Sequence, residues 1–150
     1  MKKAVAITAA TLALFAAFPA AAQFAKPADA VKYRESAFKL MATHFGRINA
    51  MAQGKVPFDA KAAQANAEVL SVIAKLPWDA FPAGSNVGNT EAKPEVWSQP
   101  DKFKSGAQLL IDNVAKLDTA ARAGNLDQIK AAAGEVGKSC KACHETYKKD

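Results

Sequence analysis

Residues 126–147 read LDQIKAAAGEVGKSCKACHETY, and this stretch carries both the periodicity and the chemistry that decide the fold. Its apolar side chains recur at steps of three and four, which keeps them on one side of an α-helix. The stripe begins at Leu126 and continues in register to Cys140 and Cys143. Asn125 stands just before it, where asparagine is a typical helix cap. The pattern therefore predicts a helix whose two cysteines face the core.

Cys140-Lys141-Ala142-Cys143-His144 is a Cys-x-x-Cys-His sequence, the attachment signature of a c-type haem. Two thiols must reach the two vinyl groups of one porphyrin and form thioethers, and the next residue must present an imidazole to the iron. On a helix, Cys140 and Cys143 lie on one side and His144 lies one turn beyond Cys140. We therefore predict one covalent haem c, attached through Cys140 and Cys143, with His144 as the iron ligand.

Other uses of the two cysteines explain the sequence less well. A redox-active dithiol is typical of a strand-helix-strand context, and the chain has no strand pattern. Zinc needs four ligands, but there are no other cysteines and His44 is the only other histidine. A structural disulfide would leave His144 without a role.

Residues 1–22 have the parts of a secretory signal peptide. Two lysines follow the first methionine, an apolar stretch runs to Phe18, and three alanines ending at Ala22 offer a cleavage site. An uncleaved membrane anchor is the alternative, but the stretch is short for a span and Pro19 interrupts it. We predict cleavage after Ala22, a periplasmic location, and no membrane association once the signal is removed.

The rest of the chain has the size of one ordinary domain with one core. The formal net charge of the whole chain is +6, and its lysines form no long run, which argues against a nucleic-acid binder. A looser cluster surrounds the haem motif. It is either a solvated face or a docking surface for a periplasmic redox partner, and it consists of Lys138, Lys141, Lys148 and Lys149.

Three further segments show the same helical periodicity, and Asp59 is a predicted cap of the second of them. Four amphipathic helices in one small domain predict an all-α fold, an antiparallel up-down-up-down four-helix bundle with the haem in its core. The additional stripes are Val31, Arg34, Phe38, Met41, Phe45 and Ile48; Asn66, Val69, Ile73 and Leu76; and Phe103, Ala107, Leu110, Val114, Leu117 and Ala121.

The stretch from Pro77 to Trp97 is the one long connection, and loops of this length are usually functional. It contains Trp78 and Phe81, so we predict a strap that covers one end of the bundle and brings these aromatic side chains near the haem. Simple packing of the bundle's end is the alternative.

Arg34 lies on the first stripe where an apolar residue is expected, with Glu35 beside it. A charge on a buried stripe is costly unless it is paired. Haem propionates supply two carboxylates, which the forked donors of arginine match. We therefore predict that Arg34 and Glu35 mark the propionate edge of the haem; the alternative is an arginine whose charged end reaches water.

Function depends on the second axial position of the iron. A methionine or histidine ligand there would make an electron carrier, whereas an empty position would bind a small gas. Phe38 follows Arg34 by one turn, which predicts an apolar, crowded and vacant site opposite His144. Met41, on the same stripe, is the candidate ligand, and its alternative role is core packing.

The chain resembles the cytochromes c′ over residues 23–150. The resemblance implies a periplasmic, usually homodimeric protein with a five-coordinate, high-spin haem that binds NO and CO and scavenges NO. It places His144 as the proximal ligand, Phe38 at the distal position, and Lys148 where relatives carry a basic residue after the haem histidine. The segments that carry it include Lys32-Tyr33-Arg34, His44-Phe45-Gly46-Arg47, Leu76-Pro77-Trp78, Pro94-Glu95-Val96-Trp97-Ser98 and Cys140 to His144.

Two other functions compete with gas binding. An electron-transfer cytochrome of a respiratory or denitrification chain would use the lysine cluster for docking, but a vacant iron position argues against it. A haem peroxidase needs a distal acid–base residue, which Phe38 does not supply. We therefore expect a protein that is not an enzyme.

Overall fold

The computed structural model describes residues 23–149, so the predicted signal peptide lies outside the described residues. The described part is helical, with an isolated β-bridge between Ala92 and Lys148, and this confirms the all-α prediction. The long helices are α1 (Pro27–Ala52), α2 (Ala60–Ile73), α4 (Pro100–Arg122) and α5 (Leu126–Tyr147); the short ones are the 3-10 helix η1 (Pro77–Ala80) and α3 (Glu95–Ser98).

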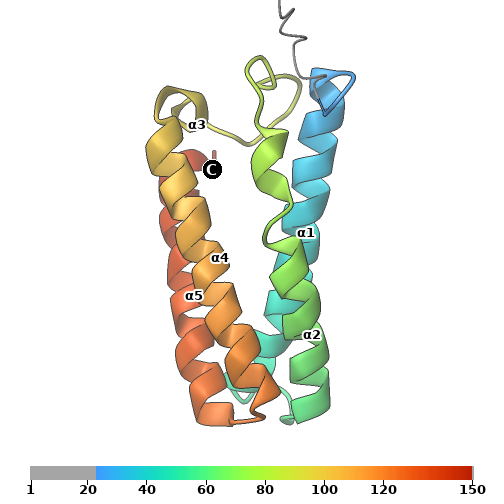
Figure 1. The fold of residues 1–150 in the computed structure, drawn as a ribbon, viewed down its shortest axis with the longest axis vertical. Helices are drawn as coiled ribbons and strands as arrows, with labels where there is room; N and C mark the ends of the chain where they lie inside the picture. Colours follow the sequence, from blue (N-terminus) through green and yellow to red (C-terminus); the bar gives the residue numbers. More distant parts are fainter. Residues whose placement is uncertain (1–22, 150) are drawn as a thin grey trace, which may run out of the picture.

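The four long helices run side by side along one axis, with α1 and α2 on one side of the bundle and α4 and α5 on the other (Figure 1). The short turns that join α1 to α2 and α4 to α5 lie at one end. The connection formed by residues 77–97 lies at the other end, together with the end of α5. This is the predicted up-down-up-down bundle.

Local sequence explains where the helices begin and end. The predicted caps Asp59 and Asn125 each accept a hydrogen bond, of 3.0 Å, from the backbone N–H three residues further on. Gly54 and Gly124 follow the ends of α1 and α4 with positive φ angles of 70° and 64°. Glycine adopts this conformation without a steric penalty, so the chain can reverse there.

The predicted stripes of α1, α4 and α5 face the core. All six stripe residues of α4 are buried, and so are the stripe residues of α5 from Ile129 to Val136. In α1, Phe38 and Phe45 are half-buried, because they line a cavity instead of filling the core. The predicted core positions are thus confirmed for three of the four long helices.

The predicted stripe of α2 is confirmed at Ile73, which is buried, but it is wrong at Val69 and Leu76. Val69 and Leu76 are 40% and 42% exposed, whereas Leu70 is 1% exposed. The helix also ends at Ile73, before Leu76. The reason is that α2 packs largely through small side chains, which the pattern of large apolar residues does not reveal; these are Ala63, Ala67 and, at its end, Ala74.

None of the helices in residues 23–149 has both the length and the apolar character needed to cross a membrane.

Candidate functional site

A cavity of about 780 Å³ lies between the four long helices and the 77–97 connection. This volume is typical of pockets for organic ligands and cofactors, which measure about 300–1,000 Å³. Cys140, Cys143 and His144 all line it. The structure therefore brings the three residues of the predicted haem motif to one cavity.

Helix α5 positions the motif, and a buried polar contact with α4 fixes the register between the two helices. The amide Nδ2 of Asn113 on α4 donates a hydrogen bond of 2.9 Å to Oγ of Ser139, directly before Cys140. Both side chains are buried, so breaking the bond would leave unpaired polar groups in the core. Sequence reasoning missed this pair because neither residue belongs to an apolar stripe or a motif.

Cys140 and Cys143 are free thiols that line the cavity. Burial raises the pKa of both thiols, and the nearby Cys143 raises that of Cys140 further. Gly106 of α4 lies against Cys143: a Cβ atom at this glycine would be only 3.3 Å from the Cys143 Sγ atom. Two free thiols and an imidazole thus face one large cavity, and this donor set fits a haem c.

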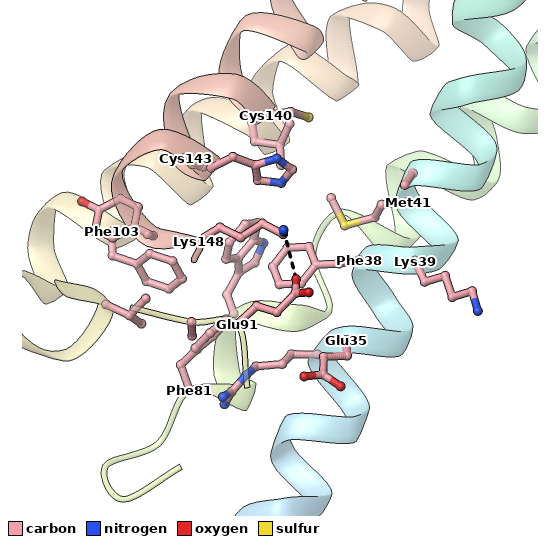
Figure 2. Close-up of a pocket in the computed structure, with 18 of the residues that line it drawn as sticks. Glu35, Phe38, Lys39, Met41, Phe81, Glu91, Phe103, Cys140, Cys143 and Lys148 are labelled. Atoms are coloured by element: carbon pink, nitrogen blue, oxygen red, sulfur yellow. Dashed lines mark ion pairs between the residues drawn. The ribbon is translucent and has the colours of Figure 1, made fainter. Parts of the chain in front are cut away.

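The wall opposite the cysteines is apolar and belongs to α1. Phe38 and Met41 point from α1 into the cavity, towards Cys140 and Cys143 (Figure 2). Phe38 packs edge-on against Trp78, with ring centroids 5.6 Å apart. The structure therefore places Phe38 across the cavity from the haem motif.

The aromatic side chains of the connection also line the cavity, as predicted for Trp78 and Phe81. Phe81 contacts Phe103 of α4 at 4.9 Å between centroids, and Phe103 contacts Tyr147 of α5 at 5.2 Å. This chain of edge-to-face contacts joins the connection to both helices beside the haem motif.

The structure shows protein partners for Arg34 that sequence reasoning missed. Its side chain is only 2% exposed, so it does not reach water, and four of its five N–H donors bind the connection. The acceptors are Ala80 O at 2.8 Å and Ser85 Oγ, Ser85 O and Thr90 Oγ1, each at 2.9 Å. These acceptors lie 46 to 56 residues further along the chain, and no local pattern marks them.

Within residues 23–149, no carboxylate pairs directly with the charge of Arg34. The guanidinium carbon lies 4.4 Å from the centroid of the Phe81 ring and 5.6 Å from that of Trp97. Burial lowers the pKa of Arg34, and neighbouring Glu35 partly opposes this effect. Glu35 itself is exposed and lines the cavity.

Lys148 lines the cavity as well, and its ammonium group is paired with a residue that sequence reasoning missed, Glu91. The other lysines of the cluster also have partners on the protein, so the cluster is largely compensated. The contacts are Lys138–Glu135 at 2.7 Å, Lys141–Glu145 at 3.7 Å, Lys148–Glu91 at 3.1 Å, and Lys149 Nζ to Thr90 O at 2.9 Å.

Comparison with known proteins decides the family, because a family model described as Cytochrome C′ matches residues 29–148. The chain belongs to the cytochrome c′ family. As a member of the cytochromes c′, it carries covalent haem c, and it has two cysteines, Cys140 and Cys143, both of which line the cavity. The four-helix bundle is the fold of solved cytochromes c′.

Individual cytochromes c′ match over nearly their whole length. Cytochrome c′ of Alcaligenes xylosoxydans xylosoxydans is 53% identical over 127 residues, which cover 85% of this chain and 98% of that protein. The crystal structure of cytochrome c′ from Rubrivivax gelatinosus has a TM-score of 0.83 and 53% identity, covering 85% and 100%. A nitric oxide complex of a variant of cytochrome c prime from Alcaligenes xylosoxidans has a TM-score of 0.80 and 52% identity, covering 85% and 99%.

We predict that Arg34→Lys lowers the free energy of unfolding of the haem-loaded protein by about 1–3 kcal/mol. Lysine keeps the charge but cannot reach the same four acceptors, which leaves buried oxygen atoms unpaired. Urea unfolding followed by tryptophan fluorescence measures the change. Arg122→Lys is the matched control, since Arg122 is exposed and pairs with Asp118 on its own helix. Equal losses in the two variants would contradict the anchoring role of Arg34.

Proposed function

We propose that this chain is a periplasmic haem protein that binds NO and CO at a vacant axial position of its iron and scavenges NO. The observation that carries the proposal is the wall opposite the haem motif, where Phe38 of α1 faces Cys140 and Cys143 (Figure 2). An aromatic ring cannot ligate iron. The nitric oxide complex of the related Alcaligenes xylosoxidans protein supports the same choice of ligand.

The residues of this chain have distinct roles in the proposal. The haem, when bound, supplies an iron centre that takes a diatomic ligand. Cys140 and Cys143 would hold the porphyrin edge against α5, and His144 would ligate the iron. Phe38 narrows the approach to the opposite position and excludes water from it. Phe38 and Met41 offer no hydrogen-bond donor for bound O2, which favours NO and CO.

Met41 is the residue that could fill the vacant position. Its side chain is 6% exposed and packs in the main hydrophobic cluster while also lining the cavity. We propose that it serves as core packing, because methionine adapts well to irregular space beside a cofactor. The chain is then not an electron carrier of the two-ligand type. We also propose that it is not an enzyme, because Phe38 and Met41, which face the haem motif from α1, cannot transfer protons.

We predict that Phe38→Ala accelerates CO binding to the ferrous protein by about tenfold or more. Removing the ring lowers the steric barrier to the vacant position, and about 1.4 kcal/mol of barrier corresponds to a factor of ten. Stopped-flow absorbance after mixing with CO measures the rate. Phe58→Ala is the control, since Phe58 packs against the core without lining the cavity. Unchanged kinetics in Phe38→Ala would contradict the gating role.

We also propose a homodimer that associates through α1 and α2. Of the eight large apolar side chains exposed within residues 23–149, six belong to these helices or to the segments next to α2. Such a concentration on one side of a bundle is typical of a protein interface. The six are Tyr33, Leu40, Val56, Val69, Val72 and Leu76.

We predict that Leu40→Lys shifts the haem-loaded protein from dimer to monomer, because a charge in a second copy's apolar interface is costly to bury. Leu40 is 50% exposed. Leu109→Lys is the matched control, because Leu109 is 54% exposed but lies on α4. Sedimentation equilibrium measures the mass of each variant. Dissociation by Leu109→Lys alone, or by neither variant, would contradict this interface.

A further inference from the structure

The segment of residues 90–93 in the connection is fastened from two directions. From α1, Nη2 of Arg34 donates to Oγ1 of Thr90 at 2.9 Å. From the chain after α5, Nζ of Lys149 donates to the carbonyl oxygen of Thr90, also at 2.9 Å. Thr90 is buried, with 4% exposure. It therefore links the first helix to the end of the haem-binding helix.

Backbone pairing continues from Thr90 to the residues that follow it. The N–H of Lys149 donates to the carbonyl oxygen of Glu91 at 2.7 Å, and the N–H of Lys93 donates to that of Tyr147 at 2.8 Å. Between these bonds, Ala92 and Lys148 form an antiparallel bridge. These backbone contacts therefore keep Glu91 and Lys148 next to each other independently of their side chains.

The side chains of this pair lie at the solvent-exposed edge of the haem cavity. Nζ of Lys148 lies 3.1 Å from Oε2 of Glu91, and both residues line the cavity together with the haem motif. Figure 2 shows the ion pair as a dashed line among the residues that line the cavity. Lys39, which also belongs to the lining, extends away from the cavity in the same view.

We propose that Glu91 is a positioning residue that holds the ammonium group of Lys148 in the haem cavity and cancels its charge there. The inference rests on the haem site of the proposed function and deepens it. A compensated pair gives an anionic ligand no net attraction, so the cavity suits neutral diatomic gases. The pair also contributes to the charges that act on the iron. Its side chains are 43% exposed for Lys148 and 66% exposed for Glu91, so solvent screens part of this effect.

Lys148 and Glu91 have opposite effects on the reduction potential of the haem when only one of the two charges is present. A free ammonium group near the haem stabilises the reduced iron, which carries one positive charge less, and so raises the reduction potential. A free carboxylate stabilises the oxidised iron and lowers the potential. When both are present at 3.1 Å, their effects on the iron largely cancel.

The test is a set of reduction potentials measured by spectroelectrochemical titration of the haem-loaded proteins. We expect Glu91→Gln to raise the potential, Lys148→Met to lower it, and the double variant to return close to the original value. Glu91→Asp, which keeps the charge, should retain most of the original potential. Glu135→Gln is the matched control, since Glu135 pairs with Lys138 on the exposed side of α5 and does not line the cavity.

The inference is overturned if Glu91→Gln changes the potential no more than Glu135→Gln does. It is also overturned if both single variants shift the potential in the same direction. Such a result would mean that either substitution loosens the 77–97 connection and admits water to the haem, whatever charge it removes. A failure of the proposed function is recognised separately. A sixth iron ligand would appear in the absorption spectra of the same samples, whatever the Glu91 variants do to the potential.

Discussion

Two thiols on one helix can hold the same porphyrin only if both leave the helix on the same side, and if Cys140 and Cys143 hold the haem, as proposed, that side faces the core. Cys140 and Cys143 continue the apolar stripe of α5, so the haem must occupy space that core side chains fill elsewhere in the bundle. At this end the helices enclose a cavity, and its opposite wall is formed by α1. The identity of the α1 residue across the cavity then decides what the iron can bind.

A bundle with a large cofactor at one end needs a cover at that end, and the 77–97 connection provides it. The connection is held to α1 by the buried guanidinium group of Arg34, which donates hydrogen bonds to backbone and hydroxyl oxygens. Arg34 is well suited to this task because its rigid fork can bind several acceptors at once. The same connection supplies Trp78 and Phe81 to the cavity wall and Glu91 to its charge balance. The 77–97 connection therefore both covers the end of the bundle and forms part of the cavity wall.

The sequence predicted the features that depend on short-range patterns. The stripes of α4 and α5, the caps at Asp59 and Asn125, and the haem motif all follow from local spacing, and the structure places them as expected. Two positions predicted for the core face of α2, Val69 and Leu76, were wrong because alanines make many of its contacts, and alanine gives little contrast between core and surface.

The partners of Arg34 and of Lys148 could not be predicted, for a different reason. Their acceptors lie in a connection without periodicity, and only the folded chain brings Ser85, Thr90 and Glu91 to them. A charged residue on an apolar stripe signals that a partner must exist, but it does not say which one. For Arg34 the prediction chose the propionates of the cofactor, whereas the protein itself supplies most of the acceptors.

The absorption spectrum of the ferrous protein, recorded before and after addition of CO, tests the vacant axial position most directly. A vacant position predicts one broad high-spin band without CO, which changes to a sharp low-spin spectrum when CO binds. Narrow, split bands that CO leaves unchanged would contradict it. They would mean that a protein side chain, with Met41 the first candidate, occupies the sixth position, and that the chain is an electron carrier.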